Sequence, residues 1–146
     1  VNVVPITCHI GRGTSKPVDV EDRSEQRTDS EEYDLPEETA EAGNRALASD
    51  ENTVTACGTT VARGLESSLS ADETVKPDHS WTDLFVYPEY EFKIVERMIT
   101  NFHRPESMLM MMGAAFAGYD FLFEAYEEAF EEEYRLFAFG DAIFIK

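Results

Sequence analysis

The sequence predicts an α/β fold, because extended segments alternate with helical patterns along it. The β-branched run TVTAC (residues 53–57) is typical of a buried strand and leads through Gly58-Thr59-Thr60 into the helical pattern VARGLESSL. Further on, the extended segment EFKIVERMITNF (91–102) precedes SMLMMMGAAFAG (107–118), which is apolar on every face and predicts a buried helix. Strands that alternate with helices are typical of a sheet with flanking helices.

The N-terminal part has weaker patterns. Residues 1–20 are predicted to be extended, with a turn at Gly11 and Gly13. Residues 19–34 are strongly acidic and have little apolar periodicity, so we expect mostly a loop there. A helix is predicted from Pro36 to about residue 48, because proline suits a first turn and the glutamates after it favour the positive end of the helix dipole.

The other segments complete the predicted order of elements. Residues 70–80 are polar and are expected to form a mobile loop, and TDLFVYP (82–88) is expected to be extended. Gly118 should end the buried helix, and residues 120–134 combine an apolar stripe with a glutamate-rich side, which predicts an amphipathic helix. The end of the chain, residues 134–145, predicts two short strands about a Gly140-Asp141 turn, a C-terminal β-hairpin.

The composition is strongly acidic. Thirty Asp and Glu residues face 12 Lys and Arg residues, for a net charge of −18. Such a surface repels nucleic-acid phosphates and anionic lipids at long range. It is explained either by solubility or by adaptation to high salt, where the screening length falls to about 3 Å at 1 M.

Length and the remaining composition predict one domain of a cytoplasmic protein. The 146 residues, 42% of them hydrophobic, are enough for one core, and because the chain starts with Val we expect a fragment or processed product. No apolar run reaches the ~18 residues of a membrane span, and there is no signal-peptide pattern. Cys8 and Cys57 lack the spacing of a zinc or redox motif, which favours a reduced compartment.

The first candidate site is Gly58-Thr59-Thr60, where a strand passes into a helix. Free amides at a helix N-terminus attract anions, and the two hydroxyls add donors. Alternatively, Thr60 only caps the helix. Arg63, one turn later, could bind a carboxylate or phosphate, or it could pair on the surface with Glu66.

The second candidate site is His103, at the end of the segment Thr100-Asn101-Phe102-His103. Imidazole titrates near neutrality and can act as acid or base, and residues that follow a strand are often catalytic in α/β proteins. Asn101 and Ser107 nearby favour a polar site, although a single histidine can also be purely structural.

Other residues give weaker signals. His9 precedes Gly11-Arg12-Gly13, which is too short for a dinucleotide fingerprint, and Cys8 beside it points to the opposite face of the strand. We interpret the methionines at 108 and 110–112 as packing residues and not as a soft metal site. Asp141 would ordinarily be a turn residue.

Six segments occur in the order of one known family: HIGRGTSKPV, SEEYDLPEETAEAGNRA, TACGTTVARGLES, WTDLFVYP, FKIVERMITNFHRPESMLMMMGAAFAG and EEEYRLFAFGDAIFI. Together they resemble the C-terminal part of the S-adenosylmethionine:tRNA ribosyltransferase-isomerases of queuosine biosynthesis, over nearly all of the chain. The resemblance implies the partial main α/β domain of that fold, without its N-terminal portion and β-barrel insertion.

The resemblance also implies a reaction. That family transfers the ribosyl part of S-adenosylmethionine, used as a cosubstrate, to 7-aminomethyl-7-deazaguanine at the tRNA wobble position. The product is the epoxide precursor of queuosine, adenine and methionine leave, and no metal is expected. The expected partners are therefore that tRNA and S-adenosylmethionine, with no membrane, and the oligomeric state stays open.

Roles are assigned to residues on the basis of this resemblance. His103 would be the base or proton shuttle, with Asp141 and His9 as orienting or base-reading groups. The substrate-binding candidates are Gly58, Thr59, Thr60, Arg63, Thr100, Asn101, Phe102 and Ser107.

The sequence also departs from the family pattern. Two histidines usual in the family are replaced by Gln26 and Asp29, Gly-Thr-Phe by Gly13-Thr14-Ser15, and Pro-Gly-Tyr by Pro88-Glu89-Tyr90. Two other hypotheses therefore stand beside the enzyme: an inactive remnant that binds an adenosine-type ligand or a protein, and an acidic structural domain.

Overall fold

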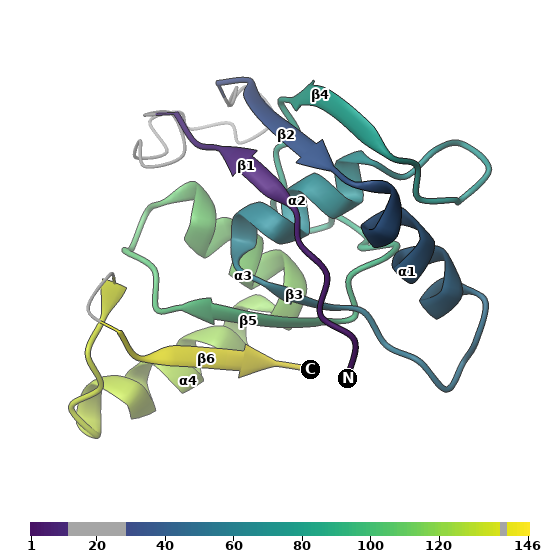
Figure 1. Ribbon diagram of the computed structural model, residues 1–146. Helices are drawn as coiled ribbons and strands as arrows, with labels where there is room; N and C mark the ends of the chain where they lie inside the picture. The colour runs from purple at the N-terminus through teal and green to yellow at the C-terminus, as the bar shows by residue number, and fades with distance from the viewer. Residues whose placement is uncertain (12–28, 138–139) are drawn as a thin grey trace.

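The computed structural model describes residues 1–11, 29–137 and 140–146, which form two three-stranded sheets and four helices (Figure 1). In chain order the elements are β1 (Thr7–His9), β2 (Glu31–Leu35), α1 (Glu37–Leu47), β3 (Thr55–Cys57), α2 (Thr59–Ser67), β4 (Asp78–Thr82), β5 (Arg97–Asn101), α3 (Met108–Ala117), α4 (Tyr119–Glu131) and β6 (Ala142–Ile145). The predicted α/β class is confirmed, and each of the four predicted helices is present.

The first sheet has the strand order β1-β2-β4 and is antiparallel throughout. Its middle strand, β2, alternates strictly: Glu31, Tyr33 and Leu35 are buried, whereas Glu32 and Asp34 are half-buried on the outer face. This alternation is expected for a sheet with one face on the core.

The second sheet has the order β3-β5-β6, with β3 parallel and β6 antiparallel to β5. Helix α2 connects the two sheets, because it contacts β1, β2 and β4 of the first and β3 and β5 of the second. Figure 1 shows α2 between the two sheets, with α3 and α4 behind the second one.

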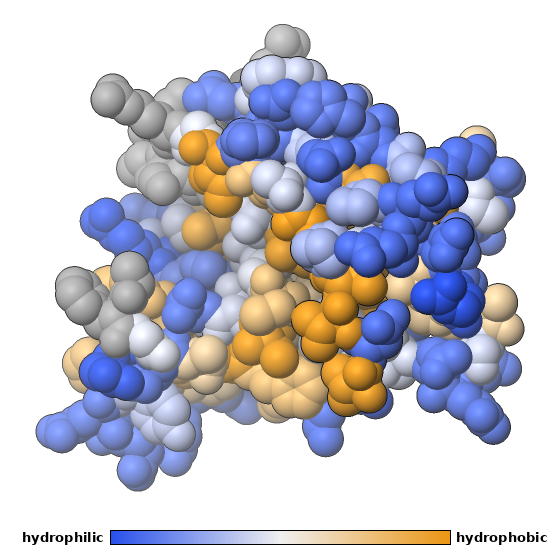
Figure 2. Space-filling model, viewed as in Figure 1, coloured by the Kyte–Doolittle hydropathy of each residue, from blue (hydrophilic) through white to orange (hydrophobic). Residues whose placement is uncertain are grey.

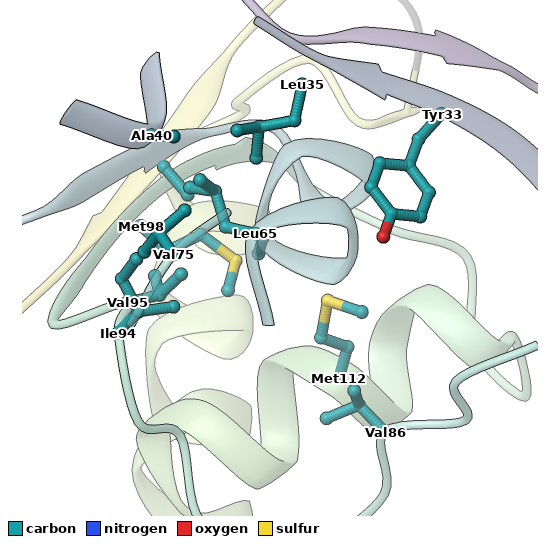
Figure 3. Close-up of a cluster of buried hydrophobic side chains, with 12 residues drawn as sticks. Tyr33, Leu35, Ala40, Leu65, Val75, Val86, Ile94, Val95, Met98 and Met112 are labelled. Atoms are coloured by element: carbon teal, nitrogen blue, oxygen red, sulfur yellow. The ribbon is translucent and has the colours of Figure 1, made fainter. Parts of the chain in front are cut away.

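The main core lies around α2 (Figure 3). Leu65 of α2 belongs to the same buried cluster as Leu35 of β2, Met98 of β5, Met112 of α3 and Ile94. A smaller cluster, which includes Leu122 and Ile145, joins α3, α4 and β6. The methionines of α3 that are buried therefore fill the core, as the sequence predicted.

The face of the molecule seen in Figure 2 carries many hydrophilic side chains. In Figure 2 the apolar side chains gather along the middle, where the N-terminal segment crosses in front of the sheets. Val1 and Val3 in that segment are fully or largely exposed, as is Ile10 at its end. Across the described ranges, no single helix is long and apolar enough to cross a membrane; α3 and α4 would suffice only together, and they are bent by 113°.

Two predicted loops contain strands. Residues 31–34 were expected in an acidic loop but belong to β2, where the buried Glu31 is compensated by Arg63 from another element. Residues 78–80 were expected in a polar loop but begin β4, an edge strand with polar and exposed side chains. The predicted extended segment at 82–88 contributes only Thr82 to a strand.

The described residues do not form the predicted C-terminal β-hairpin. Residues 134–137 form no strand, and among the described residues β6 pairs only with β5. Instead, the Asp141 carboxylate accepts bonds from the Arg135 backbone and guanidinium, and Phe137 N–H donates to Phe102 O at 2.9 Å. The contacts of Asp141 with Arg135 and of Phe137 with Phe102 therefore hold this segment where a pair of hydrogen-bonded strands was predicted.

The buried carboxylate of Glu66 fixes the chain before β5. It accepts hydrogen bonds from the backbone N–H groups of Lys93, Ile94 and Val95 at 3.0–3.2 Å, and from Tyr90 Oη at 3.1 Å. Hydrogen bonds to an ionised acceptor are stronger than neutral ones. Glu66 thus attaches α2 to the segment that leads into β5.

We expect Glu66→Leu to lower the free energy of unfolding by about 3 kcal/mol or more, because three backbone donors lose their acceptor. Glu66→Gln should cost less, about 1–2 kcal/mol, because its amide oxygen can still accept from two of them. Urea unfolding followed by circular dichroism measures both. The control Glu124→Leu, on the exposed side of α4, should stay within about 0.5 kcal/mol; equal losses at both positions would refute the anchoring role.

Glu89 has a left-handed backbone, with φ 89°, at the position where the resembled family has glycine. A side chain in this conformation costs roughly 1–2 kcal/mol. We expect Glu89→Gly to raise the free energy of unfolding by about 1 kcal/mol, measured by the same method. Glu91→Gly, two residues on, is the matched control and should not stabilise; a loss of stability in Glu89→Gly would contradict the expectation.

Candidate functional site

The candidate site lies where the parallel strands β3 and β5 end. Cys57 is in register with Ile99, and Gly58 N–H donates to Ile99 O at 2.7 Å. Because parallel strands end at the same edge of a sheet, the turn after β3 and the segment after β5 emerge together there. This is the edge at which open α/β sheets bind ligands.

The turn after β3 is made by Gly58. Its φ of 107° is a conformation that glycine adopts without strain, and it lets β3 pass directly into α2. Gly58 itself is the N-cap residue, and no side chain caps the helix. The alternative that Thr60 caps the helix is therefore wrong, and the first-turn amides have no hydroxyl partner at the cap.

Thr59, Thr60 and Arg63 of α2 line a small hollow. Its other walls come from the chain after β4 and from the start of α3: Leu84, Phe85, Val86, Met108, Leu109 and Met112. The free volume of about 10 Å³ would hold one water molecule but not a nucleoside. The hollow therefore has polar side chains on one side and apolar side chains on the others, and it is too small to be a nucleoside pocket.

Arg63 forms a buried ion pair with Glu31 of β2; both side chains are less than a tenth exposed. Glu31 also accepts a hydrogen bond from Gly11 N–H at 3.0 Å. The predicted surface pairing with Glu66 is wrong, because Glu66 turns to the segment before β5. Burial lowers the pKa of Arg63, but guanidinium titrates so high that it stays charged at neutral pH.

His103 lies in a second polar cluster at the same edge. Its Nε2 is 2.9 Å from Thr100 Oγ1, and its backbone N–H donates to Tyr126 Oη at 2.6 Å. Phe102 is buried and meets Tyr126 edge to face, with ring centroids 5.1 Å apart. His103 is thus held through its imidazole by β5 and through its backbone by α4.

Burial lowers the pKa of His103 to about 4, so the imidazole is neutral at pH 7. Burial also raises the pKa of Tyr126, an effect partly opposed by the hydrogen bond from the His103 backbone. The tyrosine hydroxyl therefore stays protonated. A neutral imidazole can accept a proton, which is the state that a general base needs.

Two other predicted site residues shape the loop beside His103. Asn101 Nδ2 donates to Asp141 O at 3.2 Å, and the Asp141 carboxylate pairs with Arg135 at 2.9 Å. Hydrogen bonds from Arg135 lower the pKa of Asp141, so Asp141 is ionised at neutral pH and already engaged.

Ser107 and His9 have other surroundings. Ser107 caps α3: its Oγ accepts from Met110 N–H at 3.1 Å and donates to Arg104 O at 2.7 Å. His9 lies exposed on β1, in the other sheet, opposite Glu32. Ser107 therefore has a structural role at the helix start, and the structure does not bring His9 together with His103.

The two clusters share an edge but not one formed cavity. The hollow beside α2 is lined by Thr59, Thr60 and Arg63, and none of Thr100–His103 lines it. Sequence reasoning also missed Glu31 and Tyr126; Tyr126 could have been noticed as a hydroxyl on the apolar stripe of its helix. No group of three or more His, Cys, Asp or Glu side chains suited to a metal occurs in the part of the chain that the structure describes.

Of the departures from the family pattern, Gln26 and Gly13–Ser15 lie outside the described residues, whereas Asp29 is described and precedes β2.

Comparison with known proteins then decides the family. Residues 1–145 match the family model described as Queuosine biosynthesis protein. The chain belongs to this family.

Two curated relatives and one solved structure indicate how much of the family this chain spans. It is 50% identical to the S-adenosylmethionine:tRNA ribosyltransferase-isomerase of Natranaerobius thermophilus, over 99% of this chain and 42% of the relative. Identity to the enzyme of the same name from Clostridioides difficile is 43%, over 100% of this chain and 42% of the relative. The crystal structure of S-adenosylmethionine tRNA ribosyltransferase from Thermotoga maritima matches with a TM-score of 0.68 and 44% identity, over 80% of this chain and 41% of that chain.

The chain therefore spans about two fifths of the length of the relatives that it matches. The resemblance to the C-terminal part of this family, predicted from the motifs, is confirmed.

We expect the imidazole of His103 to titrate near pH 4, because burial disfavours its charged form. Between pH 4 and the ordinary value of 6.5 the unfolded chain binds more protons at this residue than the folded chain does. The free energy of unfolding should therefore rise with pH across this window, and less so in His103→Gln. Nuclear magnetic resonance of the imidazole C–H signals measures the midpoint; a value above 6 would contradict the prediction.

Proposed function

We propose that this chain carries part of the active site of a tRNA-modifying S-adenosylmethionine:tRNA ribosyltransferase-isomerase. In that reaction the ribosyl group of S-adenosylmethionine is transferred to 7-aminomethyl-7-deazaguanine at the tRNA wobble position and isomerised to the epoxide precursor of queuosine. The observation that carries the proposal is the neutral, hydrogen-bonded imidazole of His103 at the edge where β3 and β5 end. The names of the relatives support it.

His103 is the proposed general base. The reaction needs removal of a proton from the carbon beside the sulfonium, where the positive sulfur makes the C–H group acidic. Burial holds the pKa of His103 at about 4, so the imidazole is unprotonated at neutral pH, the form in which it can accept a proton. General-base catalysis of this kind contributes about 10²–10⁴-fold in rate.

The start of α2 is the proposed site for the carboxylate of the methionine part. Gly58, Thr59 and Thr60 present amides and hydroxyls there without a side-chain cap, at the positive end of the helix dipole. Arg63 adds positive charge beside them, although its pairing with Glu31 makes it mainly a support for this wall.

The remaining candidates have supporting roles in the proposal. Thr100 and Phe102 contact His103 or its tyrosine partner, and Asn101 holds the loop that contains Asp141. His9, exposed on the other sheet, is kept as a candidate for reading the tRNA base. Ser107 acts through the start of α3, whose first residue Met108 lines the hollow.

The charge indicates how the tRNA would be held. With a net charge of −18, this chain repels phosphates. We therefore propose that most contacts to the tRNA backbone come from the portion of the family fold that this chain does not span. A tRNA substrate implies a cytoplasmic location.

The test uses a protein that includes this chain and the rest of the family fold. It measures, by chromatography and mass spectrometry, the adenine released from S-adenosylmethionine and tRNA that carries the modified base. We expect His103→Ala to lower the rate by about 100-fold or more, since it removes the base. The matched control is His79→Ala, an exposed histidine on β4, which should keep the wild-type rate.

Adenine release that survives His103→Ala would exclude this residue as the base. Calorimetric binding of S-adenosylmethionine with no release would support the alternative of a remnant that binds an adenosine-type ligand.

A further inference from the structure

The side chain of Thr100 is fixed beside the imidazole of His103. Thr100 is an inward-facing residue of β5 and only 7% exposed, and its Oγ1 lies 2.9 Å from His103 Nε2. Threonine is β-branched and therefore stiff about its first side-chain torsion. The hydroxyl thus meets one particular ring nitrogen in a position set by the sheet.

The backbone of His103 is fixed independently. Tyr126 Oη accepts the His103 backbone N–H at 2.6 Å, and the tyrosine ring is held by edge-to-face contact with Phe102. Tyr126 comes from α4, whereas Thr100 belongs to β5. Two elements therefore fix the histidine, one through its backbone and one through its ring.

The two ring nitrogens of His103 are consequently unequal. Nε2 has Thr100 as a partner, whereas Nδ1 makes no hydrogen bond to any residue that the structure describes. In neutral imidazole one nitrogen carries the proton and the other accepts. Which of them carries it is decided by the partner of the other nitrogen.

We propose that Thr100 is a positioning residue, whose hydroxyl oxygen accepts Nε2–H of His103 and so leaves Nδ1 as the basic nitrogen that faces the substrate. The proton removed from carbon would bind to the Nδ1 lone pair, while the C–H electron pair stays on the carbon beside the sulfonium. The Nε2–H···Oγ1 bond persists through this step and becomes charge-assisted once the ring is protonated. If Thr100 donated instead, Nδ1 would carry the proton and could not act as a base.

This inference rests on the proposed role of His103 as the base, but its main test does not require activity. Long-range ¹H–¹⁵N spectra of the imidazole rings distinguish the two neutral tautomers, and the chain has only three histidines to assign. At pH 7 we expect His103 in wild-type protein to show a protonated Nε2 and an unprotonated Nδ1. A protonated Nδ1 in the wild type would overturn the proposal, with no variant needed.

Variants then test whether Thr100 is the cause. Thr100→Val keeps the shape but removes the acceptor, so we expect a mixture of tautomers, whereas Thr100→Ser should keep the wild-type tautomer. The matched control is Thr82→Val, a threonine of β4 that is also 7% exposed but bonds to Ser67. An unchanged tautomer in a folded Thr100→Val, checked by circular dichroism, would overturn the proposal.

A kinetic readout separates this inference from the proposed function. In Thr100→Val we expect adenine release to fall by up to about 100-fold in kcat with little change in KM, and Thr100→Ser to restore most of it. No adenine release from the wild type would contradict the proposed function while leaving the tautomer result to decide the role of Thr100. Equal rates in wild type and Thr100→Val would refute the positioning role.

Discussion

The parallel pairing of β3 with β5 is the constraint on which the rest of the structure depends. Both strands must end at one edge for the start of α2 and the segment after β5 to lie near each other, and the Gly58 to Ile99 hydrogen bond is the last link of that pairing. Ala56 and Met98 fix the register because both are fully buried. A slip by one residue would turn these side chains outward and expose the core face.

Two charged residues of helix α2 attach it to its surroundings: Arg63 to the other sheet and Glu66 to the segment before β5. Arg63 and Glu66 are three positions apart, a spacing at which opposite charges often pair within a helix, yet each has a partner elsewhere: Glu31 of β2 and the backbone before β5. Buried charges pay a large desolvation cost that only well-placed partners offset. These contacts therefore fix how α2 sits between the sheets, because removing either residue leaves buried partners without a counterpart.

The sequence predicted those features that depend on local pattern. All four helices and the strands β3 and β5 follow from apolar periodicity and from breakers such as Gly58 and Gly118. The sequence did not predict the elements that depend on contacts between residues far apart in the chain. Glu31 is tolerated in a strand because Arg63 pairs with it, and Asp141 binds Arg135 where a hairpin was predicted. For the site, the motifs only suggested candidate residues, and their partners, such as Tyr126 for His103, come from elements that pack together only in the folded chain.

The charges within the site differ from those of the whole chain. His103 is neutral and Arg63 is paired with Glu31, while the chain as a whole carries −18. A negative long-range field attracts a sulfonium cation and repels phosphate. Under the proposed function, this part of the fold would therefore concentrate the donor, and the tRNA would have to be held against its repulsion by other parts of the enzyme. Salt weakens both effects together, because exposed charges more than about 8 Å apart are largely screened at physiological ionic strength. Under the proposed function, the acidic surface would attract the cationic donor, and the uncharged imidazole of His103 would accept its proton.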